Sequence, residues 1–357
     1  MMKSYLLGID IGTSACKVAV FDRNGKVLAA ASGDYPVYYP HEGWAEQNPE
    51  EWWDAVCRAT KETIQKADIT ADEIAGIGID GQSWSAIPID REGNVLANTP
   101  IWMDTRAQSI CDRLNQEIGQ EEIFEVAGNS LQPSYSTAKI LWYKENLPEV
   151  YAKIYKILQS NSYIAFKLTG VVTQDVSQGY GLHCFNMKKG CWDEKMCKRL
   201  GIPMEFLPEI CDCDHVVGTV TGKAAAECGL VEGTPVVAGG LDAACGTLGA
   251  GVIHSGETQE QGGQAGGMSI CTEEYKADPR LILSYHVVPG KWLLQGGTTG
   301  GGGVMRWFER EFADYERMMK EQTGASSLDQ LNKIAEKVAP GCEGMVFLPY
   351  MSGERSP

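Results

Sequence analysis

The sequence predicts an α/β protein of two domains. Its 357 residues are enough for two domains of about 150 residues each, both with sizeable cores. Apolar runs rich in Ile, Val and Phe, at 5–11, 15–21 and 74–81, predict strands. The segment 49–67 lies between them and carries apolar residues at helical spacing, which predicts a helix. Strands that alternate with helices are typical of α/β folds.

Composition and charge exclude several classes of protein. The net charge is −16 at pH 7, so we expect no nucleic-acid partner and no anionic membrane surface, which both need a basic field. No N-terminal segment reads as a signal peptide, and no apolar run is long enough to span a bilayer. These observations predict a cytoplasmic protein. The sequence also lacks P-loop, Rossmann and zinc-protease motifs.

The twelve cysteines are scattered, and in a cytoplasmic protein we expect them to be reduced and buried. Their densest group lies at 183–215, together with two histidines. The spacings there do not give paired C-x-x-C knuckles, so a structural zinc ion is a minor alternative.

The opening of the chain predicts a hairpin with an anion-binding turn. The strands 5–11 and 15–21 are joined by a tight turn made of Gly12, Thr13 and Ser14. Successive N–H groups in such a turn, with two hydroxyls and Lys17 nearby, suit a phosphate. Asp10 ends the first strand and suits Mg²⁺, which prefers carboxylates and water. An ordinary hairpin with a solvated Asp10 is the alternative.

Two further segments repeat the hairpin pattern. A polar, Gly-containing turn at 22–28 leads into a third strand and so predicts a meander of three strands. The similar segment 87–96 predicts a second hairpin within the same sheet.

The helix predicted at 49–67 has a clear start. Asn48 is a good N-cap, Pro49 suits the first turn, and Glu51 is placed to complete a capping box. Trp52 and Trp53 follow at helical positions, where we expect core anchors rather than a platform on which a sugar stacks.

The strand predicted at 74–81 runs into a polar loop. Ligands of open α/β sheets gather beyond the carboxyl ends of the strands. The loop residues suited to hydrogen-bond and cover a polyol are Gln82, Ser83, Trp84 and Ser85. A plain connecting loop is the alternative. Further on, Asp104 and Arg106 suit either sugar hydroxyls or an ion pair with each other.

The segment 236–242 resembles the first strand and its turn, since it consists of an apolar strand, then glycines, then a carboxylate. Asp242 would stand at the start of the helix that follows. An N-cap is the commonest role of Asp at that position.

Six motifs, in order, resemble the FGGY carbohydrate kinases, a branch of the actin/hexokinase-like ATPases. They occupy 8–14, which contains Asp10-Ile11-Gly12-Thr13-Ser14, and 44–49, 102–106, 139–142, 235–242 and 347–355. The resemblance covers nearly all of the chain and is nearest to the xylulokinase branch. It implies a ribonuclease H-like/actin-like ATPase architecture, with two domains around a cleft. Residues 1–236 would form the first domain and 237–357 an incomplete second domain, because family members continue well past this point.

The resemblance also implies roles for the candidate residues. The family's general base falls on Asp242, which would take the proton of the attacking sugar hydroxyl. Asp10 would position Mg²⁺, and ATP phosphates would contact Gly12, Thr13, Ser14 and Lys17. The sugar would contact Gln82, Ser83, Trp84, Asp104, Arg106 and Asp242. For Asp104 and Arg106, the analogy favours sugar contact over a structural ion pair.

Two departures from the family pattern bear on function. Gly263 and Gln264 lie where the family has Gly-Thr-Ser-Gly, but the sequence here reads Gly263-Gln264-Ala265-Gly266. Amides of a Gly-rich turn still suit a phosphate, so both residues are candidates for binding ATP. Xylulokinases commonly carry Met-His where this chain has Ser83-Trp84. The particular sugar therefore stays open.

The sequence thus predicts ATP-dependent phosphorylation of a ketopentose such as D-xylulose. One alternative is a kinase of another polyol or sugar acid, such as glycerol, gluconate or ribulose. The other is a non-catalytic polyol-binding remnant of the family. The expected partners are a small sugar and ATP with Mg²⁺, and a homodimer is left open.

Overall fold

The computed structural model describes residues 4–263, 266–298 and 300–351. The chain divides into two compact units. The first consists of Met1–Gly256 and Cys271–Leu294, and the second of Glu257–Ile270 and Gln295–Pro357. Among the described residues, no helix is both long and apolar enough to cross a membrane.

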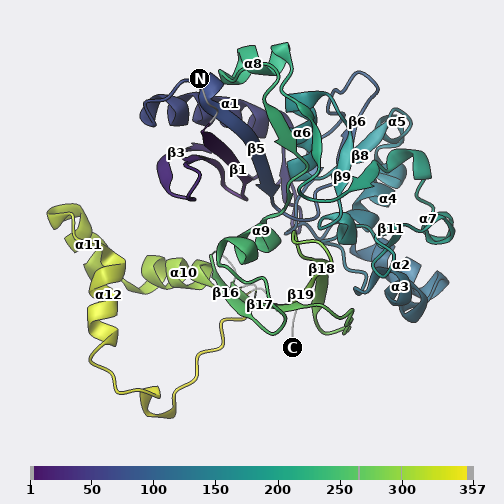
Figure 1. The fold of residues 1–357 in the computed structure, drawn as a ribbon. Coiled ribbons are helices and arrows are strands. Elements are labelled where there is room, and N and C mark those ends of the chain that lie inside the picture. The colour runs from purple at the N-terminus through teal and green to yellow at the C-terminus, as the bar shows by residue number, and fades with distance from the viewer. Residues whose placement is uncertain (1–3, 264–265, 299, 352–357) are drawn as a thin grey trace. The chain divides into compact units, whose positions relative to one another are not determined.

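The first unit is built on a seven-stranded mixed sheet (Figure 1). The strand order is β13-β14-β5-β1-β2-β3, and β15 also pairs with β5. Strand β5 is parallel to β1, β14 and β15, whereas the remaining pairs are antiparallel. The strands are β1 (Tyr5–Ile11), β2 (Ala15–Phe21), β3 (Val27–Asp34), β5 (Ile74–Gly81), β13 (Val216–Thr219), β14 (Pro235–Val237) and β15 (Gly240–Leu241). The predicted α/β class is confirmed.

The opening hairpin and the third strand form as predicted. Strand β1 pairs with β2 from Leu6↔Phe21 to Ile11↔Cys16, and β2 pairs with β3. Alternate side chains of β1 and β2, such as Ile9 and Val18, are buried, because successive residues of a strand point to opposite faces.

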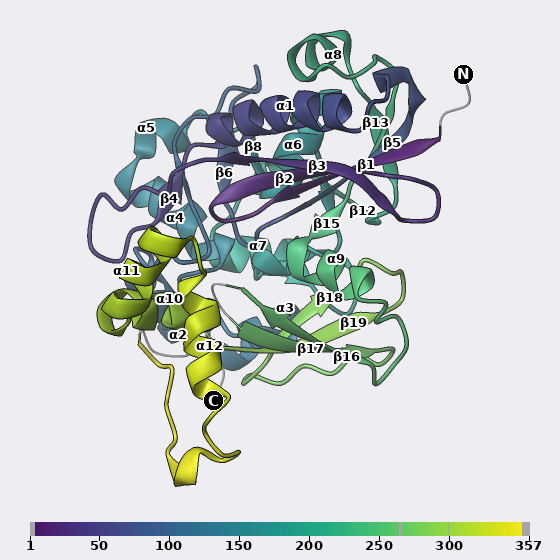
Figure 2. The same cartoon turned by 90° about the vertical axis from the view of Figure 1, so that its left-hand side faces the viewer.

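Three helices contact one another and cover one face of this sheet: α1 (Pro49–Lys66), α6 (Ser160–Thr169) and α8 (Gly222–Cys228). Figure 2 shows α1 lying over β2 and β3. The start of α1 is as predicted at Asn48, whose side chain accepts the N–H of Glu50. Glu51 instead accepts a hydrogen bond from the Tyr38 hydroxyl at 2.7 Å, so the predicted capping box is wrong.

The two tryptophans of α1 belong to the core. Trp52 and Trp53 are both buried and join the apolar cluster that contains the β1 and β2 side chains. Core packing is therefore confirmed, and the alternative of a sugar-stacking platform is wrong.

The second predicted hairpin lies in a different sheet. Its turn forms, with the Asp90 N–H donating to the Asn94 carbonyl at 3.0 Å. Strand β6 (Ile87–Ile89), however, pairs with β8 (Lys156–Leu158) in a separate two-stranded sheet. All three β6 residues are buried, and the apolar residues of β8 supply a partner that is far away in sequence. The prediction that this hairpin joins the main sheet is wrong.

The rest of the first unit consists of short elements. Most pack around a second apolar core that includes Ile110, Leu141 and Met196. The helices are α2 (Gln108–Glu117), α3 (Gln120–Ala127), α4 (Ser136–Asn146), α5 (Pro148–Tyr151), α7 (Glu194–Leu200) and α9 (Asp242–Gly249). The strands are β4 (Glu46–Gln47), β7 (Thr99–Pro100), β9 (Thr173–Asp175), β10 (Phe185–Asn186), β11 (Cys191–Trp192), β12 (Glu209–Cys211) and β18 (Ile282–Tyr285).

The second unit contains one hairpin and three helices among its described residues. Strand β16 (Thr258–Gly262) pairs antiparallel with β17 (Gly266–Thr272). Strand β19 (Trp292–Thr298) carries the chain from the first unit into the second. The helices are α10 (Gly302–Phe312), α11 (Asp314–Thr323) and α12 (Ser327–Ala335).

Candidate active site

Neighbouring strands of the main sheet bring charged side chains into one row. Asp10 of β1 lies opposite Asp80 of β5, and Asp80 lies opposite Gly240 of β15. On the other side of β1, Lys17 of β2 lies opposite Asp10. Residues at paired positions of adjacent strands share a face of the sheet. The row lies at the carboxyl ends of β1 and β5, and Asp242 follows β15 directly.

Lys17 and Asp10 form the exposed end of this row. The Lys17 Nζ lies 3.0 Å from the Asp10 Oδ2, and the two side chains are 69% and 30% exposed. The hydrogen bond and the charge of Asp10 raise the pKa of Lys17, with the charges of Asp80 and Asp242 adding to the effect. The structure therefore brings the predicted phosphate-binding cation next to the predicted metal-binding carboxylate.

Asp80 is a member of the row that the sequence analysis missed. Burial, followed by the charges of Asp10 and Asp242, raises the pKa of Asp80 to about 9, and its side chain is hydrogen-bonded to Asp10. A signal for it was present, because Asp80 lies at the end of an apolar strand and is followed by Gly81, while Asp10 also ends an apolar strand and has a glycine two residues further on.

Asp242 is the first residue of α9 and owes its place to Gly239. The chain turns at Gly239 with a φ of +71°, and a Cβ there would lie 1.7 Å from the Ile79 carbonyl oxygen. Only glycine fits so close to β5. The Ala243 N–H donates to the Asp242 Oδ1 at 2.6 Å, which lowers the pKa of Asp242. Burial outweighs this effect and raises that pKa to about 7.

A buried network of hydrogen bonds fixes the backbone at the start of α9. Asp175 accepts hydrogen bonds from the Ser177 hydroxyl at 2.5 Å and from Asn161 at 2.9 Å. The Ser177 Oγ also accepts the Leu241 N–H at 2.9 Å, and Asn161 donates to the Ala238 carbonyl at 3.1 Å. Asp175 therefore fixes the backbone on both sides of Gly239.

The turn between β1 and β2 is tied to the protein through its carbonyl groups. The carbonyl oxygens of Gly12 and Ser14 accept from the Tyr35 hydroxyl (2.7 Å) and the Tyr35 N–H (3.3 Å). The carbonyl of Thr13 accepts from the Gln47 Nε2 at 2.8 Å. The Gly12 N–H donates to the Ala15 carbonyl at 3.1 Å, so the N–H groups of Thr13 and Ser14 are the turn's candidates for an anion.

The predicted sugar loop follows β5 directly. Gln82 is buried, and Ser83 is half-buried. Trp84 has a φ of +60° and is buried, with one ring face stacked on Tyr135 at a centroid distance of 4.1 Å. Sugar contact by these loop residues stays a prediction.

The buried ammonium group of Lys139 holds the backbone of this loop. Its Nζ donates to the carbonyl oxygens of Trp84 (2.8 Å), Ile101 (2.8 Å) and Ser134 (2.6 Å). One cation thus joins three segments that are far apart in the sequence.

Asp104 and Arg106 pair with each other. The Arg106 Nη2 lies 2.8 Å from the Asp104 Oδ2 and 2.7 Å from the Glu46 Oε2, with side-chain exposures of 3% for Arg106 and 0% for Asp104. The guanidinium also lies 3.8 Å from the centroid of the Trp44 ring. The structure thus contains the ion pair that the sequence left as an alternative, and sugar contact by these two residues stays a prediction.

The second phosphate motif falls in the second unit. Gly263 is exposed, and its carbonyl accepts the Gly302 N–H at 2.7 Å. Gln264 lies outside the described residues.

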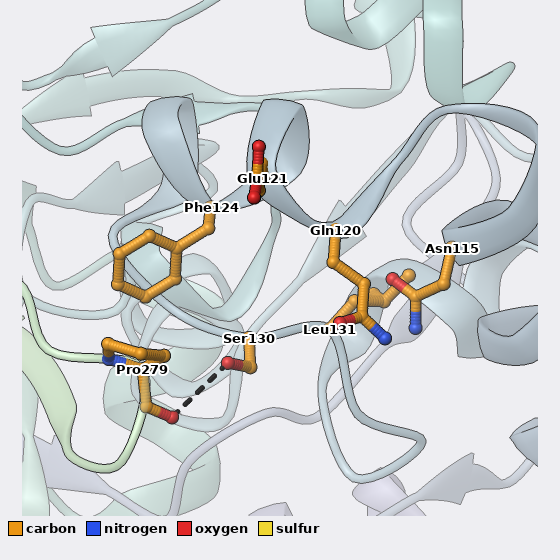
Figure 3. A pocket seen from close by; sticks show the side chains of 7 residues that line it. All are labelled: Asn115, Gln120, Glu121, Phe124, Ser130, Leu131 and Pro279. Atoms are coloured by element: carbon orange, nitrogen blue, oxygen red, sulfur yellow. Dashed lines mark hydrogen bonds between the residues drawn. The ribbon is translucent and has the colours of Figure 1, made fainter.

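A pocket of about 310 Å³ opens elsewhere in the first unit, beside α2 and α3 (Figure 3). The Ser130 hydroxyl donates to the Pro279 carbonyl at 3.3 Å on its wall. The residues that line it are Asn115, Gln120, Glu121, Phe124, Ser130, Leu131 and Pro279. The pocket includes none of the predicted site residues.

Comparison with known proteins identifies the family. The pattern of the "FGGY family of carbohydrate kinases, N-terminal domain" matches residues 5–249. The chain belongs to this FGGY family. It is 32% identical over 355 residues to a xylulose kinase of Bacillus subtilis, which covers 99% of this chain and 69% of that protein. It is 31% identical over 361 residues to a gluconokinase of the same species, covering 100% of this chain and 69% of the relative.

Solved structures of the FGGY family agree in fold. The xylulose kinase of Rhodospirillum rubrum superposes with a TM-score of 0.87 at 29% identity, over 99% of this chain and 71% of that one. The actin-like ATPase architecture that the motifs implied is therefore confirmed.

The row of carboxylates fits a hard divalent cation. Among the described residues, no three His, Cys, Asp or Glu side chains are placed to hold a metal ion together. Mg²⁺ in phosphate-transferring enzymes commonly takes only one or two carboxylates and completes its shell with water and phosphate oxygens. Asp10, partly exposed at the end of β1, fits that pattern.

Proposed function

We propose that this FGGY kinase transfers the terminal phosphate of ATP to a hydroxyl group of a ketopentose such as D-xylulose. The observation that carries the proposal is the convergence of Asp10 and Asp80 with Asp242 at one edge of a single sheet. The similarity to xylulose kinases supports the choice of sugar.

Asp242 would act as the general base. It takes the proton of the attacking hydroxyl as the phosphate bond forms. A base works best when its pKa lies near the working pH, and burial brings the pKa of Asp242 to about 7. The loose transition state of phosphate transfer depends more on positioning than on full deprotonation beforehand. The Asp175 network and Gly239 supply that positioning.

The turn and Lys17 would bind the phosphates. The N–H groups of Thr13 and Ser14 and the ammonium of Lys17 offer positive charge to an anion in a chain of net charge −16. Asp10 would hold Mg²⁺, which neutralises phosphate charge when it is bound. Phosphate binding by Gly263 and Gln264 stays a prediction.

A neutral polyol is favoured over gluconate as the acceptor. A carboxylate is bound most strongly by a cation, above all by a bidentate Arg. Arg106 already pairs with Asp104 and Glu46, and Lys139 is buried against three carbonyls. Neither cation is presented to an acid.

We propose a cytoplasmic location. The domain division at residue 236 stays a prediction, and it differs from the two compact units, because the first unit runs on to Gly256 and includes Cys271–Leu294. The location is supported by the cysteines, because all twelve are free. A homodimer stays a proposal without structural support.

An assay of the full-length protein with ATP, Mg²⁺ and a panel of D-xylulose, D-ribulose, gluconate and glycerol tests the proposal. We expect ADP formation to be fastest with D-xylulose. A preference for gluconate would contradict the ketopentose assignment. Thermal stabilisation by a sugar without ADP formation would favour the polyol-binding alternative.

A further inference from the structure

One amide side chain links two predicted parts of the site. Gln47, at the end of β4, is fully buried. Its Nε2 donates to the carbonyl oxygens of Thr13 at 2.8 Å and Pro36 at 3.1 Å. Its Oε1 accepts a hydrogen bond from the Gln82 Nε2 at 2.8 Å. Gln47 therefore joins the turn that is predicted to bind phosphate to the loop that is predicted to bind the sugar.

The two backbone carbonyls determine which way both amides face. A carbonyl oxygen only accepts, so the NH₂ group of Gln47 must face Thr13 and Pro36, and its oxygen must face Gln82. Gln82 must then turn its own NH₂ toward Gln47, which directs its Oε1 away from Gln47. Within the described residues, this Oε1 is buried and accepts no hydrogen bond. A buried acceptor without a donor is unfavourable, and a ligand hydroxyl would satisfy it.

The backbone adds a second connection between the same two parts. The Gln82 N–H donates to the carbonyl of Ile11 at 2.8 Å, and Ile11 ends β1 just before the turn. A shift of Gln82 is therefore transmitted to the turn through both the main chain and Gln47.

We propose that Gln47 is a positioning residue that couples sugar binding to phosphate binding. The inference rests on the proposed function, since it takes the two ligands to be a polyol and ATP. A sugar hydroxyl donates to the Gln82 Oε1 and holds the Gln82 NH₂ against Gln47. Gln47 holds the Thr13 carbonyl, whose peptide unit also carries the Ser14 N–H. Hydrogen bonds in a chain polarise and strengthen one another. The bound sugar therefore makes the Ser14 N–H a better hydrogen-bond donor to phosphate.

The test compares Gln47→Glu with Gln116→Glu in the full-length protein. Gln47→Glu keeps an acceptor for Gln82 but loses both donors to the backbone carbonyls. Gln116 is exposed on α2, so the control makes the same chemical change away from these contacts. Calorimetry measures the Kd of a Mg²⁺-bound, non-hydrolysable ATP analogue, without and with saturating D-xylulose. The ratio of the two Kd values is the coupling factor.

We expect a coupling factor of about 5 or more for the wild type and the control, and a value close to 1 for Gln47→Glu. The sugar Kd of Gln47→Glu should stay near the wild-type value, because the contact to Gln82 is kept. If Gln47→Glu does not fold, Gln82→Met breaks the same link from the sugar side and should also abolish the coupling.

A wild-type coupling factor of 1 would overturn the inference, as would an unchanged factor in the foldable variant. Failure of the wild type to bind any sugar of the panel would overturn it too. Phosphate transfer is measured separately. A wild type that shows coupling but transfers no phosphate would refute the proposed function and leave the coupling standing.

Discussion

Asp10 and Asp80 lie opposite each other on adjacent parallel strands, with their side chains hydrogen-bonded. Two carboxylates share a hydrogen bond only when one of them carries a proton. Burial raises the pKa of Asp80 to about 9, so the proton resides on Asp80 at neutral pH. At neutral pH the protonated Asp80 therefore adds no negative charge to this edge of the sheet.

Asp80 should make the protein less stable as the pH rises. A carboxyl with a raised pKa in the folded state binds its proton more tightly there than in the unfolded chain. Stability contributed by this proton is present at low pH and is lost as the pH rises toward about 9. Asp80→Asn should therefore raise the free energy of unfolding at pH 8, by more than the roughly 1.4 kcal/mol that corresponds to one pKa unit.

Denaturant unfolding of metal-free protein at pH 5 and pH 8 measures this effect. Asp54→Asn, on the exposed side of α1, serves as the matched control and should leave the free energy of unfolding unchanged at both pH values. An Asp80→Asn variant that is less stable than the wild type at pH 8 would show that the Asp80 carboxyl is not strained by burial.

Removal of the Asp242 carboxylate should abolish turnover and spare sugar binding. General bases contribute about 10²- to 10⁴-fold to the rate, so kcat of Asp242→Ala should fall by at least 100-fold. Steady-state kinetics and calorimetric titration with D-xylulose check the two parts. Turnover within 10-fold of wild type would rule out a catalytic role for Asp242.

The same carboxylate should set the acid side of the pH profile. Asp242 must be deprotonated to accept a proton, so kcat/KM should rise with pH through about 7. The charge of Lys17 lowers the pKa of Asp242, so Lys17→Met should move this rise to higher pH. Lys26→Met, in the exposed turn after β2, is the control and should leave it in place. An unshifted pH profile in Lys17→Met would show that the charge of Lys17 does not affect the pKa of Asp242.

Gly239 should tolerate no side chain. Gly239 and Gly233 both have positive φ, but only at Gly239 would a Cβ meet another atom, the Ile79 carbonyl oxygen. Gly233→Ala should cost about 1 kcal/mol of stability, which is the conformational penalty alone. Gly239→Ala should cost several times more and should also lower kcat, because Asp242 is displaced. Thermal unfolding measures both variants. Equal losses of stability would contradict the close approach of Gly239 to β5.

Local patterns were enough to predict the hairpin, the start of α1 at Asn48 and the strand at 74–81, because each depends on residues adjacent in sequence. They did not reveal that β6 pairs with β8, since that choice depends on a partner almost seventy residues away. Asp80 was missed for a related reason. Its importance arises only when the parallel register sets it beside Asp10.

The candidate site shows the same division. Asp10, Lys17 and Asp242 could be chosen from motifs, and the structure brings them together. Whether Asp104 and Arg106 face a ligand or each other depends on Glu46, a partner that sequence spacing does not specify.

The contact of Lys139 with three main-chain oxygens has a consequence for how specificity evolves. Because the ammonium contacts a backbone oxygen that every amino acid has, it holds the chain at position 84 whatever side chain is present, provided that this side chain tolerates the φ of +60°. The side chain at this position can therefore change during evolution, and with it the sugar that is phosphorylated, while Lys139 keeps the loop backbone in place.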